Sequence, residues 1–152
     1  MPSKRDPAPQ YHTLALVIAS DPHAVRDGLR AMVARPPLSD LPEDQRGVAE
    51  LVLAEVLNNI VEHAYATTTG TIEIELESIA CGIACRVVDQ GVTMAGNTLP
   101  PDTLPAGIGG LTDDLPEGGF GWHLIRRLTC DMSYERRDGC NFLAFVIPNS
   151  PH

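Results

Sequence analysis

One helical segment constrains this chain more than any other feature: residues 51–65 are mostly apolar, yet they carry a narrow polar stripe. With about 100° of rotation per residue, the apolar face consists of Leu53, Val56, Leu57, Ile60 and Ala64. The stripe consists of Glu55, Asn58, Asn59, Glu62 and His63. Unlike an ordinary surface helix, it contains no Lys or Arg. The stripe is therefore either a solvated surface or a binding site, and the helix alone does not decide between them.

Two residues of the stripe have a specific chemical meaning. Glu55 and Asn59 lie one helical turn apart, so their side chains point in the same direction. A carboxylate beside an amide oxygen suits a hard cation that is also bound by phosphate oxygens and water.

Composition narrows the class of protein. The chain has 152 residues, 43% of them hydrophobic, which predicts one globular domain. Its net charge of −9 argues against a nucleic-acid-binding protein and against docking on anionic membranes. The chain shows no charged leader before an apolar region and no run of about 18 apolar residues, so we expect neither secretion nor membrane insertion. The four cysteines form no CxxC pair and are expected to be buried free thiols, which fits a cytoplasmic protein.

The pattern of apolar residues predicts a disordered tail at 1–11 and one domain at 12–148. Strands are expected at 13–19, 71–77, 83–88, 131–137 and 140–147, and helices at 22–34, 42–65 and 121–129. This order predicts an α/β (α+β) two-layer sandwich, in which helices cover one face of a mixed β-sheet. Residues 90–118 contain several Pro and Gly and no regular pattern, and a loop of this length is typical of an active-site lid.

A second motif, Asp89-Gln-Gly91, ends a buried strand. An Asp in this position can accept a hydrogen bond from an exocyclic amino group such as that of adenine. A glycine two residues later would let a flat ring approach the backbone. The alternative is an ordinary turn at the end of a strand, where Asp and Gly are common.

A third motif, Gly119-Phe-Gly121-Trp-His123, leads glycines directly into a helix. Free backbone N–H groups and the positive end of the helix dipole would then face a bound anion, as in a phosphate cradle. The motif is neither a Walker A loop nor a Rossmann fingerprint. The alternative is a flexible hinge.

Taken together and in this order, the three motifs resemble those of the Bergerat-fold, histidine-kinase-like ATPases, over about residues 12–147. Within that superfamily the chain looks most like the bacterial anti-sigma factor serine/threonine kinases. The resemblance is carried by the segment Glu55 to Tyr65 and by the late segment from Gly119 to Arg126, through Tyr134-Glu-Arg136, to Gly139.

The resemblance implies a role for each motif. Glu55 would be the general base, and Asn59 would coordinate Mg²⁺ on the phosphates of ATP. Asp89 would recognise adenine N6, with Gly91 allowing close packing of the base. Gly119 and Gly121 would contact the phosphates, and residues 90–118 would form the ATP lid. Such a site acts mainly by positioning and charge neutralisation.

Three further residues, Asn141, His63 and His123, are candidates for this site, and Thr93 is a departure from the family pattern. The family usually has a glycine where this chain has Thr93, and a Gly-Thr where it has Gly139-Cys. Asn141 could replace that threonine through its side chain. His63 could orient Asn59 or a phosphate, or only cap a carbonyl, and His123 could face a phosphate or solvent.

The resemblance implies an ATP- and Mg²⁺-dependent serine/threonine protein kinase that acts as an anti-sigma regulatory factor. It would phosphorylate an antagonist protein and sequester a sigma factor, and it suggests a homodimer built on the side of the N-terminal strand. An alternative is a nucleotide-binding interaction module with little or no kinase activity. The catalytic domain of a histidine kinase is a weaker alternative, because the chain shows no helix hairpin with a phospho-accepting His.

Overall fold

A computed structural model of the chain describes residues 11–93 and 119–149. The elements follow in the order β1 (Thr13–Ala19), α1 (Pro22–Val33), the 3-10 turn η1 (Leu38–Asp40), α2 (Glu43–Asn59), the π-helical turn η2 (Ile60–Ala64), β2 (Thr71–Ile79), β3 (Gly82–Asp89), α3 (Gly119–Leu128), β4 (Cys130–Arg137) and β5 (Cys140–Pro148). Most of the predicted tail and residues 94–118 of the predicted lid lie outside the described residues.

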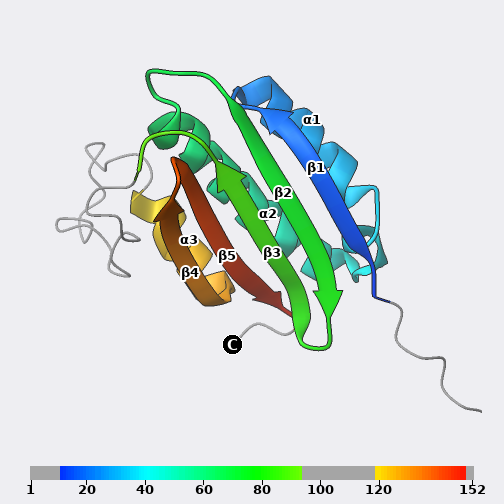
Figure 1. The fold of residues 1–152 in the computed structure, drawn as a ribbon. Coiled ribbons are helices and arrows are strands. Elements are labelled where there is room, and N and C mark those ends of the chain that lie inside the picture. The colour runs from blue at the N-terminus through cyan, green and yellow to red at the C-terminus, as the bar shows by residue number, and fades with distance from the viewer. Residues whose placement is uncertain (1–10, 94–118, 150–152) are drawn as a thin grey trace, which may run out of the picture.

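The five strands form one sheet in the order β1-β2-β3-β5-β4 (Figure 1). The two-layer α/β class is confirmed, but the prediction of a mixed sheet is wrong for the described strands, because every neighbouring pair is antiparallel. The reason lies in the connections. Two helices rather than one follow β1, so the chain returns to the end at which β1 stopped, and Thr71 of β2 pairs with Ala19. Short turns join β2 to β3 and β4 to β5, and such hairpins are antiparallel by construction.

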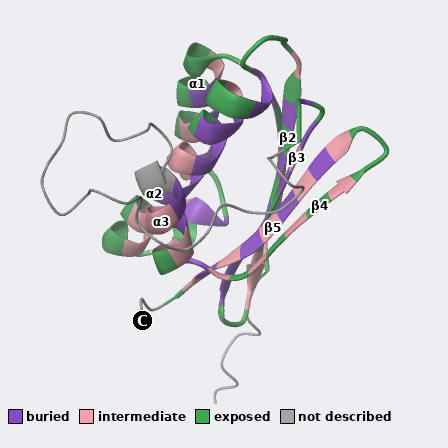
Figure 2. Ribbon diagram, turned by 90° about the vertical axis from the view of Figure 1, so that its left-hand side faces the viewer, coloured by how far each residue is buried: buried purple, intermediate pink, exposed green. Residues whose placement is uncertain are grey.

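The helices cover one face of the sheet and leave the other uncovered (Figures 1 and 2). Strand β2 shows the alternation that this arrangement requires. Its buried residues are Ile72, Ile74 and Leu76, and its exposed residues include Glu73, Glu75 and Glu77. Between the layers, Leu53 and Leu57 of α2 and Phe145 of β5 are almost completely buried. Each such side chain contributes about 1.5–3 kcal/mol to the free energy of unfolding.

The long helix differs from its prediction at one point. Residues 42–65 were predicted as a single α-helix, but α2 ends at Asn59 and a π-helical turn follows. In this turn the Tyr65 N–H donates to the carbonyl of Ile60, at 3.1 Å, instead of to the residue four positions earlier. The residues of the polar stripe also differ in burial. Asn59 is buried and Glu55 is half-buried, whereas Asn58, Glu62 and His63 are exposed.

Two smaller predictions are also corrected or refined. All four cysteines are free thiols, but only Cys85 is buried, and burial raises the pKa of its thiol well above the ordinary range. Helix α3 begins at Gly119, two residues earlier than predicted, and so includes both glycines of the third motif.

None of the helices within 11–93 and 119–149 is long and apolar enough to cross a membrane.

Candidate functional site

Asp89 lies at the end of β3 and is only 5% exposed. Its Oδ1 atom accepts hydrogen bonds from the backbone N–H of Gly91, at 2.9 Å, and from Nδ2 of Asn141, at 2.7 Å. Asn141 is opposite Asp89 in the antiparallel pair β3–β5, so the sheet itself brings the two side chains together. The structure thus places the predicted residue Asn141 in direct contact with Asp89.

Burial raises the pKa of the Asp89 carboxyl group, because desolvation disfavours the charged form. The hydrogen bonds from Asn141 and Gly91 and the positive charge of Arg136 act in the opposite direction. The carboxylate is thus a buried acceptor whose Oδ1 atom already accepts two hydrogen bonds. Such a group can discriminate between an amino group and a carbonyl group on a bound ring.

Two further residues of this network, Tyr134 and Arg136 of β4, lie in the late segment that carries the resemblance, but the sequence analysis gave them no role in the site. Arg136 is paired with Asn141 in the β4–β5 hairpin. The signal was present in the sequence, because a tight turn at Asp138-Gly139 places the residues on either side of it in register. Counting outward from that turn pairs position 136 with position 141.

Gly91 is required by a contact that the sequence did not suggest. A Cβ atom at this position would lie 2.4 Å from the carbonyl oxygen of Ala64, at the end of the π-helical turn. The next residue, Val92, donates its N–H to the same carbonyl, at 2.9 Å. The end of β3 is therefore packed directly against the end of the long helix. The backbone needs glycine here whether or not a ring approaches it.

Tyr65 makes the second link between these two ends. Its hydroxyl donates to the carbonyl of Thr71, at 2.7 Å, and accepts from the N–H of Gln90, at 2.8 Å. Burial raises the pKa of this phenol, and the nearby Asp89 charge adds to the effect. The hydroxyl consequently remains a neutral bridge between the start of β2, the end of β3 and the helix.

Asn59 is 5% exposed, and its Nδ2 atom has no acceptor among the described residues. A buried amide without a partner costs about 1–3 kcal/mol, so this group calls for a partner from outside that set. Glu55, one turn earlier, is half-buried. No three His, Cys, Asp or Glu side chains gather within 11–93 and 119–149 as a metal cage. Mg²⁺ often needs only one or two protein oxygens, with phosphate and water completing its shell, so the donors present fit it.

Gly119 and Gly121 are the first and third residues of α3, which packs against α2. Trp122 and Ile125 of α3 are buried and fix the helix to the core. The backbone N–H groups of the first helical turn have no partner within the helix and are suited to an anion. His123 is half-buried on the same helix. His63, by contrast, is exposed on the π-helical turn.

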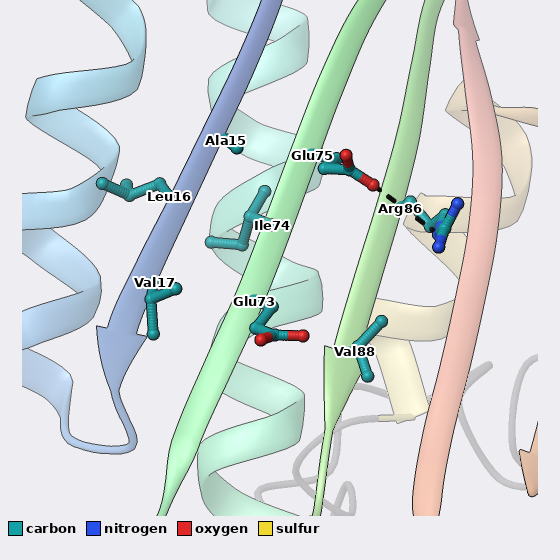
Figure 3. Close-up of a pocket in the computed structure, with 8 residues that line it drawn as sticks. All are labelled: Ala15, Leu16, Val17, Glu73, Ile74, Glu75, Arg86 and Val88. Carbon is teal, nitrogen blue, oxygen red and sulfur yellow. Dashed lines mark ion pairs between the residues drawn. The ribbon is translucent and has the colours of Figure 1, made fainter.

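A separate hollow lies on the uncovered face of the sheet (Figure 3). Ala15 and Val17 of β1 border it, together with the ion pair between Glu75 and Arg86, at 3.7 Å. Asp89 alternates with Val88 along β3 and belongs to the face that the helices cover. The hollow is therefore distinct from the site around Asp89.

The comparison with known protein families agrees with this geometry. The family of histidine kinase-like ATPase domains matches residues 18–147, which include β2, β3 and β4, the last two residues of β1 and all of β5 except its last residue. The chain belongs to this family.

Individual relatives carry more specific names. The chain is 31% identical over 98 residues to the serine/threonine-protein kinase BtrW of Bordetella bronchiseptica, covering 64% of this chain and 66% of that protein. It is 31% identical over 94 residues to the serine-protein kinase RsbW of Bacillus mycoides, covering 62% of this chain and 59% of that protein. RsbW of Bacillus anthracis gives the same identity and coverage. The matched region thus spans less than two thirds of each of these relatives.

Proposed function

We propose that the protein is an ATP- and Mg²⁺-dependent serine/threonine protein kinase that acts as a cytoplasmic anti-sigma regulatory factor. One observation carries the proposal: the segment that follows Asp89 at the end of β3 packs against Ala64, at the end of the π-helical turn that continues the helix of Glu55 and Asn59. In this proposal Asp89, which would bind the base, belongs to the same site as Glu55 and Asn59, which would act on the phosphate side. The names of the relatives support the kinase activity.

The chain's own residues divide the work of such a kinase. Asp89 accepts a hydrogen bond from the adenine amino group, and Asn141 holds its carboxylate in place. Gly119 and Gly121 offer backbone N–H groups to the phosphates. The Asn59 oxygen would hold Mg²⁺, which would neutralise phosphate charge. Of the two imidazoles, His123 would face a phosphate and His63 would orient Asn59.

Glu55 acts as the general base. The hydroxyl oxygen of a serine or threonine on the protein substrate attacks the γ-phosphorus, and the bond from that phosphorus to the β–γ bridging oxygen breaks. The hydroxyl proton passes to the Glu55 carboxylate, and ADP leaves. The side chain is half-buried, so it is partly shielded from water while remaining accessible to a substrate.

The partners follow from the resemblance to anti-sigma kinases. The substrate would be an antagonist protein, and a sigma factor would be sequestered when that antagonist is absent. Strand β1 stands at one edge of the sheet. An edge strand can pair with another chain, which supports a homodimer on this side.

Incubating the purified protein with radiolabelled ATP, Mg²⁺ and candidate antagonist proteins tests the proposal. We expect transfer of label to a serine or threonine of one antagonist. Binding of ATP without transfer to any antagonist would favour the alternative, a nucleotide-binding module that acts by sequestration alone.

Replacing Asn59 by alanine should weaken binding of Mg²⁺-ATP by about tenfold or more, and binding of metal-free ATP much less. The reason is that an oxygen bound to the cation acts only when the cation is present. Calorimetric titration with and without Mg²⁺ measures the difference. Asn58→Ala is a matched control, because Asn58 is exposed on the same helix. Equal losses in both conditions would remove Asn59 from the metal site.

A further inference from the structure

Tyr134 and Arg136 of β4 both donate hydrogen bonds to the same acceptor, the Oδ1 atom of Asn141. The tyrosine hydroxyl lies 2.8 Å from it, and Nη1 of the arginine lies 2.9 Å from it. A guanidinium group can only donate, so the atom of Asn141 that faces it must be the carbonyl oxygen. The two β4 residues therefore set which way the amide points.

With its oxygen held in this way, the Asn141 amide directs its Nδ2 donor to the other side. There it meets Oδ1 of Asp89, at 2.7 Å, and the carbonyl of Val92, at 3.1 Å. Asp89 is consequently met by donors on Oδ1 and remains an acceptor. A reversed amide would present an oxygen to the carboxylate, and the repulsion would force either a proton onto Asp89 or a change in its position.

The same two residues also hold the segment that follows Asp89. Nη1 of Arg136 donates to the carbonyl of Gly91, at 2.6 Å. The hydroxyl groups of Tyr134 and Thr93 lie 3.2 Å apart and share a hydrogen bond. Thr93, which replaces the glycine usual in the family, thus has a contact that glycine could not make. These hydrogen bonds attach residues 91–93, which follow β3, to β4.

We infer that Tyr134 and Arg136 are positioning residues for nucleobase recognition: they orient the Asn141 amide and attach residues 91–93 to β4, so that Asp89 accepts a 6-amino group and rejects a 6-oxo group. The inference rests on the proposed nucleotide-binding function. It gives a role to two residues of β4 that lie in the segment carrying the resemblance but to which the sequence analysis assigned none.

The charge of Arg136 adds a pH signature to this geometry. It lowers the pKa of Asp89 against the larger, opposite effect of burial, so removing it moves that pKa upward. Binding that needs the carboxylate is lost as the pH falls through the pKa, and the loss should begin at a higher pH in Arg136→Gln. Among the described residues, Tyr65 also interacts electrostatically with Asp89. It, His63 and His123 are present in every variant compared.

The experiment is a calorimetric titration with ATP and with inosine triphosphate, which carries a 6-oxo group in place of the amino group. We expect the wild-type protein to prefer ATP, and Arg136→Gln to reduce the ratio of the two affinities about tenfold, as expected for lost hydrogen bonds to a charged donor. Contacts to the phosphates cancel in this ratio. The ATP titration is repeated between pH 5 and 8. The loss of ATP affinity on lowering the pH should begin at a higher pH in Arg136→Gln than in the wild-type protein.

Arg137→Gln is the matched control. Its guanidinium lies over the ring of Phe142, 4.6 Å from the centroid, and the side chain is exposed, so the variant loses the same charge without touching the network. Should Arg136→Gln fail to fold, Tyr134→Phe keeps the ring and removes only the hydroxyl, and we expect it to reduce the ratio about threefold.

The inference would be overturned if Arg136→Gln and Tyr134→Phe both kept the wild-type ratio of ATP to inosine triphosphate affinity, and if Arg136→Gln lost ATP affinity at the same pH as the wild-type protein. The nucleotide-binding proposal would then still stand. The same holds if Tyr134→Phe alone is soluble and keeps the wild-type ratio. A wild-type protein that binds neither nucleotide would overturn both proposals, so the two failures are distinguishable.

Discussion

Replacing Glu55 by glutamine is expected to leave ATP binding intact and to slow phosphotransfer by about 10²–10⁴-fold. Glutamine has nearly the same shape as glutamate but cannot take up the hydroxyl proton. Glu55 lies on α2, one turn before the buried Asn59, and is itself half-buried. Single-turnover phosphorylation of an antagonist protein measures the rate, and calorimetry measures the binding of ATP.

Glu50→Gln is the control for this experiment. Glu50 lies on the same helix, carries the same charge and is exposed, so its variant should phosphorylate at the wild-type rate. If Glu55→Gln phosphorylates its antagonist as fast as Glu50→Gln, Glu55 is not the base. Loss of ATP binding in Glu55→Gln would instead show that the carboxylate holds the nucleotide or its cation.

Replacing Gly91 by alanine should reduce the free energy of unfolding by about 1–3 kcal/mol and weaken ATP binding as well. The added Cβ would lie 2.4 Å from the oxygen and 2.6 Å from the carbon of the Ala64 carbonyl. These are backbone atoms, so no side-chain rotation relieves the contact. The end of β3 or the end of the helix must move, and Asp89 is two residues away. For a domain of this size the melting temperature should fall by roughly 3–10 °C.

The opposite result is expected at Gly47. This glycine lies inside α2, and a Cβ there would meet nothing within 4 Å. Alanine at position 47 should therefore stabilise the protein by about 0.5–1 kcal/mol, since glycine is a poor helix former. Thermal unfolding of the two variants should show shifts of opposite sign. A melting temperature for Gly91→Ala at or above that of the wild-type protein would contradict the packing described here.

Much of the fold follows from sequence patterns within a single strand, helix or turn. The alternation along β2 determines which residues face the helices, because successive side chains of a strand point to opposite sides. The apolar spacing in α2 likewise determined that Leu53, Val56 and Leu57 would be buried. The glycine at 139 after Asp138 determined the last hairpin.

The candidate site was predictable to the extent that its residues stand in short motifs. Asp89 and Gly91 were recognised at the end of a strand, and Glu55 and Asn59 were recognised by their helical spacing. The register of the last hairpin also contained the pairing of Arg136 with Asn141, although it was not used. A motif identifies which chemical groups are available, but it does not state which atoms they meet.

Tertiary structure alone decided the rest, and the reason is physical. The π-helical turn after Asn59 depends on how the end of the helix meets β3 through Ala64 and Gly91, a contact between residues far apart in the chain. The burial of Asn59 depends on the neighbouring layers, which no helical periodicity describes. The direction of the Asn141 amide is set by two donors on another strand. Helical and strand periods arise from backbone geometry within a few residues, whereas the orientation of a buried polar group depends on every donor and acceptor that the fold brings around it.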